Sequence, residues 1–290
     1  MEKYDLLIVG SGIVGSSLAF YSSKNNKKVL IVEKNFTGFN SSGNAQGGLA
    51  PYLGNDNYVK KFHDNSYFLH KEFKKIFQNY TEIDPNYNEK RLIHIINSAE
   101  EKKSLLDNFE GKIISDLNSI KDFEPKLKKI NHGAIIFDRY MEVDSFNLTN
   151  SYLNSSLNMG AKFINYDFNF ENLGSKDRKV DTFITNDEKF LIKNVAITAG
   201  PWTSEIAKNN DLINVKPLKG QLLKFKTSKD FDNSISWGKD YATKKMDDLL
   251  WIGTTEEDVK FQEGQTEDAK IKILNSFYEM FDGFNDLDLV

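Results

Sequence analysis

The spacing of apolar positions changes twice within the first 33 residues of the chain. Residues 4–9 and 28–33 are short, mostly apolar runs, whereas residues 13–24 mix small and apolar side chains over a longer stretch. The two short runs predict buried strands, and the stretch between them predicts a helix. A strand, a helix and a strand within about 30 residues form a βαβ unit, which places both strands in a parallel sheet.

The rest of the chain continues to alternate between helical and extended patterns. Helical spacing predicts helices over 58–79, 99–109, 146–158 and 269–281. Apolar or β-branched runs predict strands at 91–96, 133–137, 161–164, 181–185, 189–192, 195–198, 221–226 and 249–253. Residues 37–57 are rich in Gly, Ser and Asn and predict a long loop. Loops of this length are often functional. The aromatic stretch Tyr166–Phe170 alternates as in a strand. The alternation of predicted helices and strands along the chain is typical of an α/β fold.

Composition and charge exclude several kinds of site. The chain has 290 residues, a formal net charge of -4 and no cysteine. Without excess positive charge, it lacks the composition of a protein that binds nucleic acid through bulk electrostatics. The missing cysteines exclude disulfides, thiolate metal sites, a cysteine nucleophile and a flavin tethered to cysteine. His63 and His70 are seven residues apart rather than four, and His94 and His132 stand alone, so no metal site is predicted.

Length and the N-terminal residues set the expected organisation and compartment. A chain of this length predicts about two domains. The apolar run near Met1 is shorter than a signal-peptide core, and no stretch approaches the roughly 18 apolar residues of a membrane helix. We therefore predict a cytoplasmic protein that does not contact membranes.

A glycine-rich turn follows the first predicted strand and opens the first predicted helix. Its residues are Gly10, Ser11, Gly12, Ile13, Val14 and Gly15, in a G-x-G-x-x-G pattern. The first glycine permits the tight turn, the second lets the backbone approach a pyrophosphate, and the third lets the helix pack on the strand. The N–H groups at the start of the helix then face the phosphates. These six residues are predicted to bind a dinucleotide.

An acidic residue stands where this motif requires one. Glu33 lies 18 residues after Gly15, at the end of the second predicted strand, and Lys34 follows it. The Glu33 carboxylate is expected to accept hydrogen bonds from the adenosine ribose, and it would repel the 2′-phosphate of NADP. Glu33 and Lys34 are therefore predicted cofactor contacts, but the motif alone does not decide between FAD and NAD.

The loop at 37–57 favours FAD. Its centre, residues 40–51, consists mainly of small residues, which let the backbone run beside a flat ring system. Serine hydroxyls in the same stretch can hydrogen-bond to phosphate. The predicted cofactor contacts in this loop are Ser41, Ser42, Ala45, Gln46, Gly47 and Gly48.

Together with three later motifs, this loop resembles the D-amino-acid-oxidase-like FAD-dependent oxidoreductases of the glycine oxidase and D-amino-acid dehydrogenase type. Residues 195–202 (VAITAGPW) are similar to a turn of that family, residues 217–221 (PLKGQ) to a strand entry, and residues 250–256 (LWIGTTE) to a later strand. The matches keep the family's order along nearly the whole chain.

The resemblance implies a Rossmann-like FAD-binding domain interleaved with a substrate domain on a mixed or antiparallel sheet. It places the FAD-binding domain at 1–88 and 142–210 and the substrate domain at 89–141 and 211–290. It also implies cofactor contacts at Thr198, Ala199, Gly200 and Trp202, and by motif position it puts Phe170 near the adenine. Packing is the alternative role for Phe170.

The activity that the resemblance implies is oxidation of the C–N bond of an amino acid or secondary amine by hydride transfer to FAD. By motif position Tyr241 matches a substrate-pocket tyrosine, with ordinary strand packing as the alternative. None of Arg91, Arg139 and Arg178 lies in the motif that supplies the family's carboxylate-binding arginine. That motif lies beyond Val290, so the resemblance implies a C-terminally truncated chain with weakened flavin binding and little turnover.

Two alternatives stay open. Residues 42–47 (SGNAQG) also resemble a stretch of an FAD-dependent enzyme that oxidises the carboxymethylaminomethyl group of tRNA wobble uridine. Only under that alternative is tRNA a partner; otherwise the expected partner is a small amine or amino acid. The other alternative is an inactive nucleotide-binding fragment. The sequence leaves the substrate, the electron acceptor and a homo-oligomeric state undecided.

Overall fold

The structure is a computed structural model that describes residues 1–109, 113–176, 179–207 and 214–290. The chain forms two compact units, and each is built from three separate stretches of sequence. The first unit consists of Met1–Gly47, Lys71–Tyr87 and Val143–Pro217, and the second of Gly48–His70, Asn88–Glu142 and Leu218–Val290.

A parallel sheet forms the centre of the first unit. Its strands run in the order β12 (Val195–Ile197), β2 (Leu6–Val9), β3 (Val29–Glu33) and β8 (Lys162–Asn165), and every neighbouring pair is parallel. The βαβ unit predicted from the first 33 residues is confirmed, with β2 and β3 joined by α1 (Ile13–Lys24).

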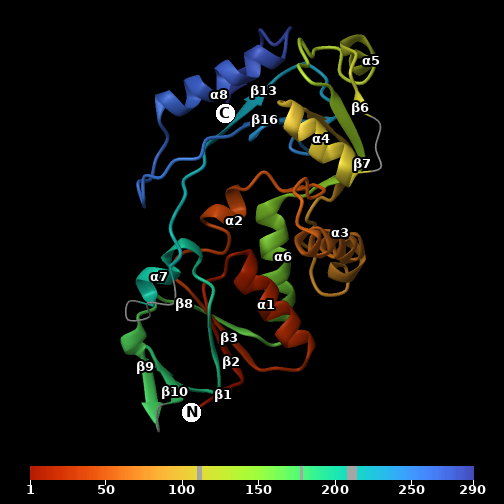
Figure 1. Cartoon of the computed structure of the whole chain (residues 1–290). Coiled ribbons are helices and arrows are strands. Elements are labelled where there is room, and N and C mark those ends of the chain that lie inside the picture. Colours follow the sequence, from red (N-terminus) through yellow and green to blue (C-terminus); the bar gives the residue numbers. More distant parts are fainter. Residues whose placement is uncertain (110–112, 177–178, 208–213) are drawn as a thin grey trace. The chain divides into compact units, whose positions relative to one another are not determined.

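Both faces of this sheet are covered, which explains why its strands are apolar throughout. On one face α1 packs beside α6 (Ser145–Asn158), so that Ala19 and Leu153 meet Ile8 and Ile31 (Figure 1). The other face packs against a second, mainly antiparallel sheet through a cluster that includes Leu7. The strand order of this second sheet is β1 (Lys3–Tyr4), β11 (Lys189–Ile192), β10 (Lys179–Ile184) and β9 (Leu173–Lys176).

Aromatic packing between the two sheets corrects one prediction. Residues 166–169 form no strand, because β8 ends at Asn165 and the 3-10 helix η1 (Phe170–Asn172) follows. Phe168 is buried and stacks on Phe183, with ring centroids 6.0 Å apart. The alternation that suggested a strand therefore reflects side chains that fill the layer between the sheets.

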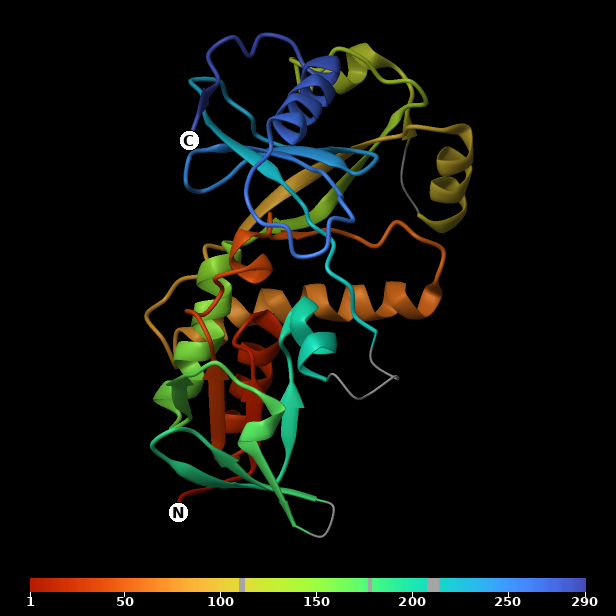
Figure 2. The same cartoon turned by 90° about the vertical axis from the view of Figure 1, so that its left-hand side faces the viewer.

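The second unit is built on a nine-stranded sheet, one face of which is apolar. A helix near the C-terminal end, drawn in blue in Figure 2, lies along this sheet. Beside its main path, β6 (Ile113–Ile114) pairs with β7. The main path runs in the order β17 (Asp288–Leu289), β13 (Leu222–Lys226), β16 (Leu250–Gly253), β15 (Asp240–Lys244), β14 (Ser234–Trp237), β5 (Asn88–Ile95), β7 (Ala134–Glu142) and β4 (Gly48–Leu49).

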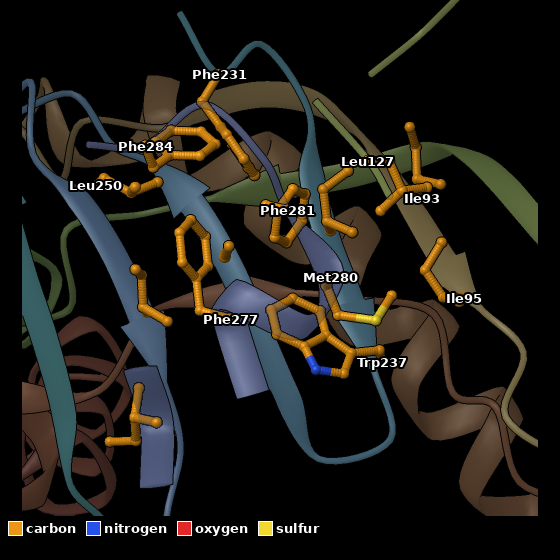
Figure 3. Packing of buried hydrophobic residues seen from close by; sticks show 14 of the residues in the cluster. Ile93, Ile95, Leu127, Phe231, Trp237, Leu250, Phe277, Met280, Phe281 and Phe284 are labelled. Carbon is orange, nitrogen blue, oxygen red and sulfur yellow. The ribbon is translucent and has the colours of Figure 1, made fainter. Parts of the chain in front are cut away.

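Helix α8 (Glu267–Met280) covers the apolar face of this sheet. Phe277 and Met280 point from the helix toward Trp237 and Leu250 on the strands (Figure 3). The opposite face is covered at its β5–β7 end by α4 (Ala99–Asn108), where Leu105 packs on Ile135. Because successive strand residues point to opposite faces, the residues between the apolar ones line the second face.

Several element boundaries differ from the predictions. The predicted loop at 37–57 contains the short helix α2 (Ser41–Asn44), and helix α3 (Asn57–Phe77) begins where the loop ends. Strand β7 continues to Glu142 rather than ending near 137. Strands β14 and β15 were not predicted, and neither were α5 (Leu117–Lys121) and α7 (Thr203–Ile206).

The largest difference between the units and the sequence-based domain division lies at residues 48–70, which belong to the second unit. Strand β4 explains the difference, since Gly48 pairs with Glu142 and Leu49 with Met141 in the large sheet. The roles assigned to the two domains stay predictions at this point.

Among the described helices, not one combines the length and the apolar character that crossing a membrane requires.

The core beneath α8 leads to a first testable prediction. Phe277 is fully buried and contacts the rings of Phe281 and Phe284, at centroid distances of 4.9 and 5.1 Å. We expect Phe277→Ala to lower the free energy of unfolding by about 3–5 kcal/mol, because it removes buried apolar area and leaves a cavity. Urea unfolding followed by tryptophan fluorescence measures the change.

Ile271→Ala on the same helix is the matched control, since Ile271 is 49% exposed. Its cost is expected to stay within about 0.5 kcal/mol. Equal losses from the two variants would contradict the packing of α8 on the sheet.

Candidate functional site

The turn between β2 and α1 is held in an unusually close contact with β12. Gly10 has a φ of +99°, and a Cβ atom there would lie 2.7 Å from the Thr198 carbonyl oxygen. The Thr198 hydroxyl donates to the carbonyl oxygens of Val9 and Gly10, both at 2.9 Å. A Cβ atom at Gly15 would lie 1.9 Å from the Gly10 carbonyl oxygen. Only glycines at positions 10 and 15 allow this approach.

The N-terminus of α1 opens from this turn, and a serine from the following loop lies across it. The N-cap is Gly12, which has no side chain to cap the helix. Instead the backbone N–H of Ile13 donates to the Ser42 hydroxyl at 2.9 Å, and a Cβ atom at Gly12 would lie 3.0 Å from that oxygen. Val14 is exposed beside it. The helix start therefore presents N–H groups to an accessible position, as an anion site requires.

Glu33 lies at the end of β3, next to this turn. One of its carboxylate oxygens accepts from the Ser11 N–H at 2.8 Å and from the Ser11 hydroxyl at 3.2 Å. The other accepts from the Asn35 N–H at 3.0 Å. Ser11 is fully buried, and its hydroxyl also lies 2.9 Å from that of Thr37. The side chain of Ser11 thus orients Glu33 rather than facing outward.

The other predicted contacts in the first unit surround the same sheet end. Thr198 directly follows β12, and Ala199 leads into the 3-10 helix η2 (Gly200–Trp202), where the Trp202 N–H donates to the Ala199 carbonyl. Ser145, at the start of α6, donates to the carbonyl oxygen of Ala45 at 2.7 Å.

The loop positions divide between the two units. Ser41 begins α2, and Gly47 has a φ of +78° and accepts a hydrogen bond from the Val143 N–H. Gln46 precedes it in the first unit. Gly48 lies in the second unit, in β4, so the structure does not group it with the other predicted contacts.

Lys34 and Phe170 are linked through the segment that follows β8. The Lys34 ammonium lies 2.8 Å from the Asp167 carboxylate, and the Tyr166 N–H donates to the Glu33 carbonyl at 2.8 Å. Phe170 is 45% exposed and contacts the Phe168 ring edge to face. An exposed aromatic ring on the segment beside Glu33 is suited to stacking on a planar base.

Comparison with known proteins decides the family. The family of FAD dependent oxidoreductases matches residues 5–290, which is almost the whole chain. The chain belongs to this family. The relationship predicted from the glycine motif, the small-residue loop and the three later motifs is therefore confirmed.

Individual relatives agree with this assignment. A glycine oxidase of Geobacillus kaustophilus (strain HTA426) is 23% identical over 267 residues, covering 88% of this chain and 70% of the relative. A glycine oxidase of Bacillus cereus ATCC 14579 has the same fold, with a TM-score of 0.89, 22% identity and coverage of 99% and 81% of the two chains. An L-proline dehydrogenase of P. horikoshii gives a TM-score of 0.87, 18% identity and coverage of 100% and 80%.

The residues of the first unit fit the cofactor of the family. The glycine turn leaves no room for a side chain at positions 10 and 15, and the start of α1 that follows it would face the pyrophosphate. Glu33 is held with its carboxylate oriented at the strand end, where a ribose requires an acceptor. Bound FAD supplies the acceptor for two electrons. The protein residues that would hold its nucleotide part are the Gly10–Gly15 turn, Ser42 and Glu33.

The predicted pocket residue Tyr241 lies in the second unit, on β15. Its ring lies over Gly253 of β16, where a Cβ atom would come within 2.7 Å of the ring. Burial, with a smaller contribution from the negative charge of Glu142, raises the pKa of Tyr241 above its ordinary value. The half-buried phenol therefore stays protonated at neutral pH and acts as a hydrogen-bond donor.

Tyr241 belongs to a set of polar side chains on the sheet face opposite α8, which we call the polar face. Adjacent strands place these side chains opposite one another, and the side chains alternate with the apolar residues that pack under the helix. The members of the polar face are Tyr241, Thr243, Ser234, Ser236, His94, Lys90 and Glu142.

A buried ion pair lies at one end of the polar face. The Glu142 carboxylate accepts hydrogen bonds of 2.5 Å from both Ser234 and Thr243, and one of 3.0 Å from Tyr140. The Lys90 ammonium lies 3.5 Å from the second carboxylate oxygen. These contacts compensate the burial of both charges and fix this end of the sheet.

A second polar cluster on the same face contains His94, which is 3% exposed. Its Nδ1 lies 2.8 Å from the Ser236 hydroxyl, and its Nε2 lies 2.9 Å from the Glu101 carboxylate on α4. In the sequence His94 stands alone, and no site is predicted there. The histidine is buried but not isolated, and no spacing signal in the sequence links it to Ser236, which is 142 residues away.

Three other residues that the sequence singled out, Arg91, Arg139 and His63, contact neighbouring side chains. Arg91 pairs with Asp138 at 3.0 Å, and Arg139 pairs with Asp64; Arg178 lies outside the described residues. His63 lies near the ring of Tyr52, at a centroid distance of 5.3 Å. Within the part of the chain that the structure describes, no three acidic or histidine side chains group as metal ligands do.

The glycine turn leads to a second testable prediction. We expect Gly15→Ala to weaken FAD binding at least ten-fold, about 1.4 kcal/mol, because the new methyl group would push α1 away from the Gly10 carbonyl. Titration of the apoprotein with FAD, followed by flavin fluorescence, measures the dissociation constant.

Ser17→Ala is the control on the same helix, because the Ser17 hydroxyl only bonds the Val14 carbonyl at an exposed position. Circular dichroism checks that both variants keep their helices. An unchanged FAD affinity in the folded Gly15→Ala variant would contradict the role of the turn.

Proposed function

We propose that this oxidoreductase oxidises the C–N bond of an amino acid or a secondary amine. Two kinds of observation support the proposal. The relatives are named for glycine and for L-proline, which are a primary and a secondary amine that each carry a carboxylate. The second unit offers half-buried hydroxyl groups on a polar sheet face, which suits a small polar substrate.

The observation that carries the proposal is the setting of Tyr241. Its phenol is protonated, its ring is fixed by Gly253, and it lies on the polar face rather than in the core beneath α8. A phenol donor of this kind fits the carboxylate of an amino acid. Neither Arg91 nor Arg139 is placed for that role, because each is paired with an aspartate at the surface of the second unit.

In the reaction, hydride leaves the carbon next to a neutral nitrogen. The protein therefore has to bind the carboxylate, orient the α-carbon and keep the nitrogen unprotonated. We assign carboxylate binding to Tyr241 and nucleotide binding to the Gly10–Gly15 turn with Glu33. The imine product then hydrolyses in water.

A substrate screen tests the proposed function. The purified protein with FAD is mixed without oxygen with glycine, L-proline and other amino acids, and the loss of the oxidised flavin absorbance is recorded. We expect reduction by small amino acids and hydrogen peroxide or a reduced acceptor when turnover is allowed. Reduction only by tRNA with a carboxymethylaminomethyl uridine would favour the alternative suggested by residues 42–47, and no reduction by either class would leave a nucleotide-binding role.

A third prediction concerns Tyr241 itself. We expect Tyr241→Phe to raise the dissociation constant of an amino-acid substrate about ten-fold or more, because a hydrogen bond to a charged group contributes about 1.5–3 kcal/mol. Spectral titration of the oxidised flavin with a carboxylate inhibitor such as acetate measures the loss. Tyr58→Phe, at a position that is 82% exposed, is the control. Equal affinities in the two variants would show that Tyr241 only packs.

A further inference from the structure

Three residues of the second unit form a continuous hydrogen-bonded chain from the polar face to α4. Ser236 on β14 lies directly opposite His94 on β5, and the two side chains are 2.8 Å apart. The other imidazole nitrogen meets Glu101 at 2.9 Å. His94 is almost completely buried, whereas Ser236 and Glu101 at the two ends are half-buried, and Ser236 is the end that lies on the polar face.

The direction of the hydrogen bonds follows from Glu101. Burial acts to raise the pKa of Glu101, but the Asn97 N–H at 2.7 Å and the hydrogen bond with His94 outweigh it, and the pKa is lowered. Glu101 is therefore an ionised acceptor, so the proton of neutral His94 lies on Nε2. Nδ1 is then an acceptor, and the Ser236 hydroxyl donates to it.

Ser236 and Tyr241 are neighbours on this face. They lie directly opposite each other in the β14–β15 ladder, and the Tyr241 ring leans away over Gly253 of β16. The two hydroxyls therefore lie on opposite flanks of β15, separated by about two strand spacings, or roughly 10 Å. A small amino acid with a hydrogen bond of about 2.8 Å at each end spans a comparable distance.

We propose that Ser236, His94 and Glu101 form a proton relay that removes a proton from the ammonium group of the substrate. The proposal rests on the amine-oxidising function proposed above. An amino acid carries an ammonium group at neutral pH, whereas hydride loss needs the neutral amine. Tyr241 binds the carboxylate end, and Ser236 meets the nitrogen end.

The relay transfers one proton and breaks no other bond. A proton of the substrate ammonium moves to the Ser236 oxygen, while the hydroxyl proton of Ser236 moves to Nδ1 of His94. The substrate nitrogen keeps the electron pair of its N–H bond and becomes neutral, and His94 becomes an imidazolium ion beside the Glu101 carboxylate. The proton returns to water through Ser236 after the product has left. Ser236 is the catalytic residue here, and His94 and Glu101 act through it.

Other charged groups on the face do not replace this relay. Among the described residues, the titratable and charged groups on the polar face or in contact with it are Tyr241 on β15, Lys90 on β5, Glu142 and Tyr140 on β7, Lys224 on β13 and Glu101 on α4, with Lys245 and Asp247 beside Trp251 of β16. Glu101 is in hydrogen-bond contact with the imidazole, and Lys90 pairs with Glu142. Lys224 lies 3.8 Å from the centre of the Trp251 ring.

The kinetic test compares Ser236→Ala with the wild type as holoenzyme. Anaerobic reduction of the flavin by glycine and by L-proline is followed below and above the pKa of the amine. We expect Ser236→Ala to slow reduction about 100-fold below that pKa, since general-base catalysis contributes about 10²–10⁴-fold. Above it the substrate is already neutral, so the variant should approach the wild-type rate. An equal loss at every pH, or no loss, would overturn the relay.

A second measurement does not depend on flavin chemistry. ¹⁵N NMR of the histidine side chains in the full chain reports which nitrogen of His94 carries the proton, and His94→Asn identifies its signals. We expect the proton on Nε2 in the wild type. Glu101→Gln should move it to Nδ1, because the glutamine amide can donate to Nε2, and this variant should also lose rate below the amine pKa. A proton on Nδ1 in the wild type would overturn the relay.

Glu100→Gln is the matched control, since Glu100 is exposed in the first turn of the same helix. It should leave both the proton position and the rate unchanged. The two proposals fail in different ways. If neither amine reduces the wild-type flavin at any pH, the proposed function is wrong and the relay falls with it. If the wild type is reduced but Ser236→Ala behaves identically, only the relay is wrong.

Discussion

The contact between α1 and the end of β2 is the constraint on which the first unit depends. The helix can begin directly after the strand only because Gly15 allows the Gly10 carbonyl to approach within a distance that no Cβ atom tolerates. The same turn is held from the other side by Thr198, which connects residues near position 10 to residues near position 200. One close contact therefore sets where the helix starts, next to the point at which Glu33 accepts a hydrogen bond from the turn.

The second unit depends on a different principle, which is the separation of the two faces of one sheet. Alternate residues of β5, β14, β15 and β16 pack under α8, so their neighbours in sequence must lie on the opposite face. That face holds an ion pair and a histidine, which have hydrogen bonds within the unit, and a phenol whose ring packs over Gly253. Burial of the apolar face thus places polar side chains together on the other face, where the proposed substrate would be oriented.

Chain connectivity explains why each unit draws on distant parts of the sequence. Strand β5 pairs in parallel with β14, so His94 lies next to a residue more than a hundred positions later. Strand β4 crosses into the large sheet immediately after the loop that contains Ser42. The loop and the strand are continuous in sequence but belong to different units. Residues that are adjacent in space, such as His94 and Ser236, are therefore far apart along the chain, whereas residues that are adjacent in sequence, such as Gly47 and Gly48, belong to different units.

The sequence by itself determined the family, the βαβ unit and the glycine turn, because these depend on local spacing. Glycines at 10, 12 and 15, followed by Glu33 at a strand end, can be recognised without knowing any distant contact. It did not reveal that Ser11 is buried against Glu33, nor that Gly48 lies in the other unit, since both facts depend on partners remote in sequence. Tyr241 could be proposed from its motif, but Ser236 and His94 could not. Their pairing exists only because the parallel alignment of β5 and β14 brings them together, and strand pairing across such a separation is decided by tertiary packing rather than by local pattern.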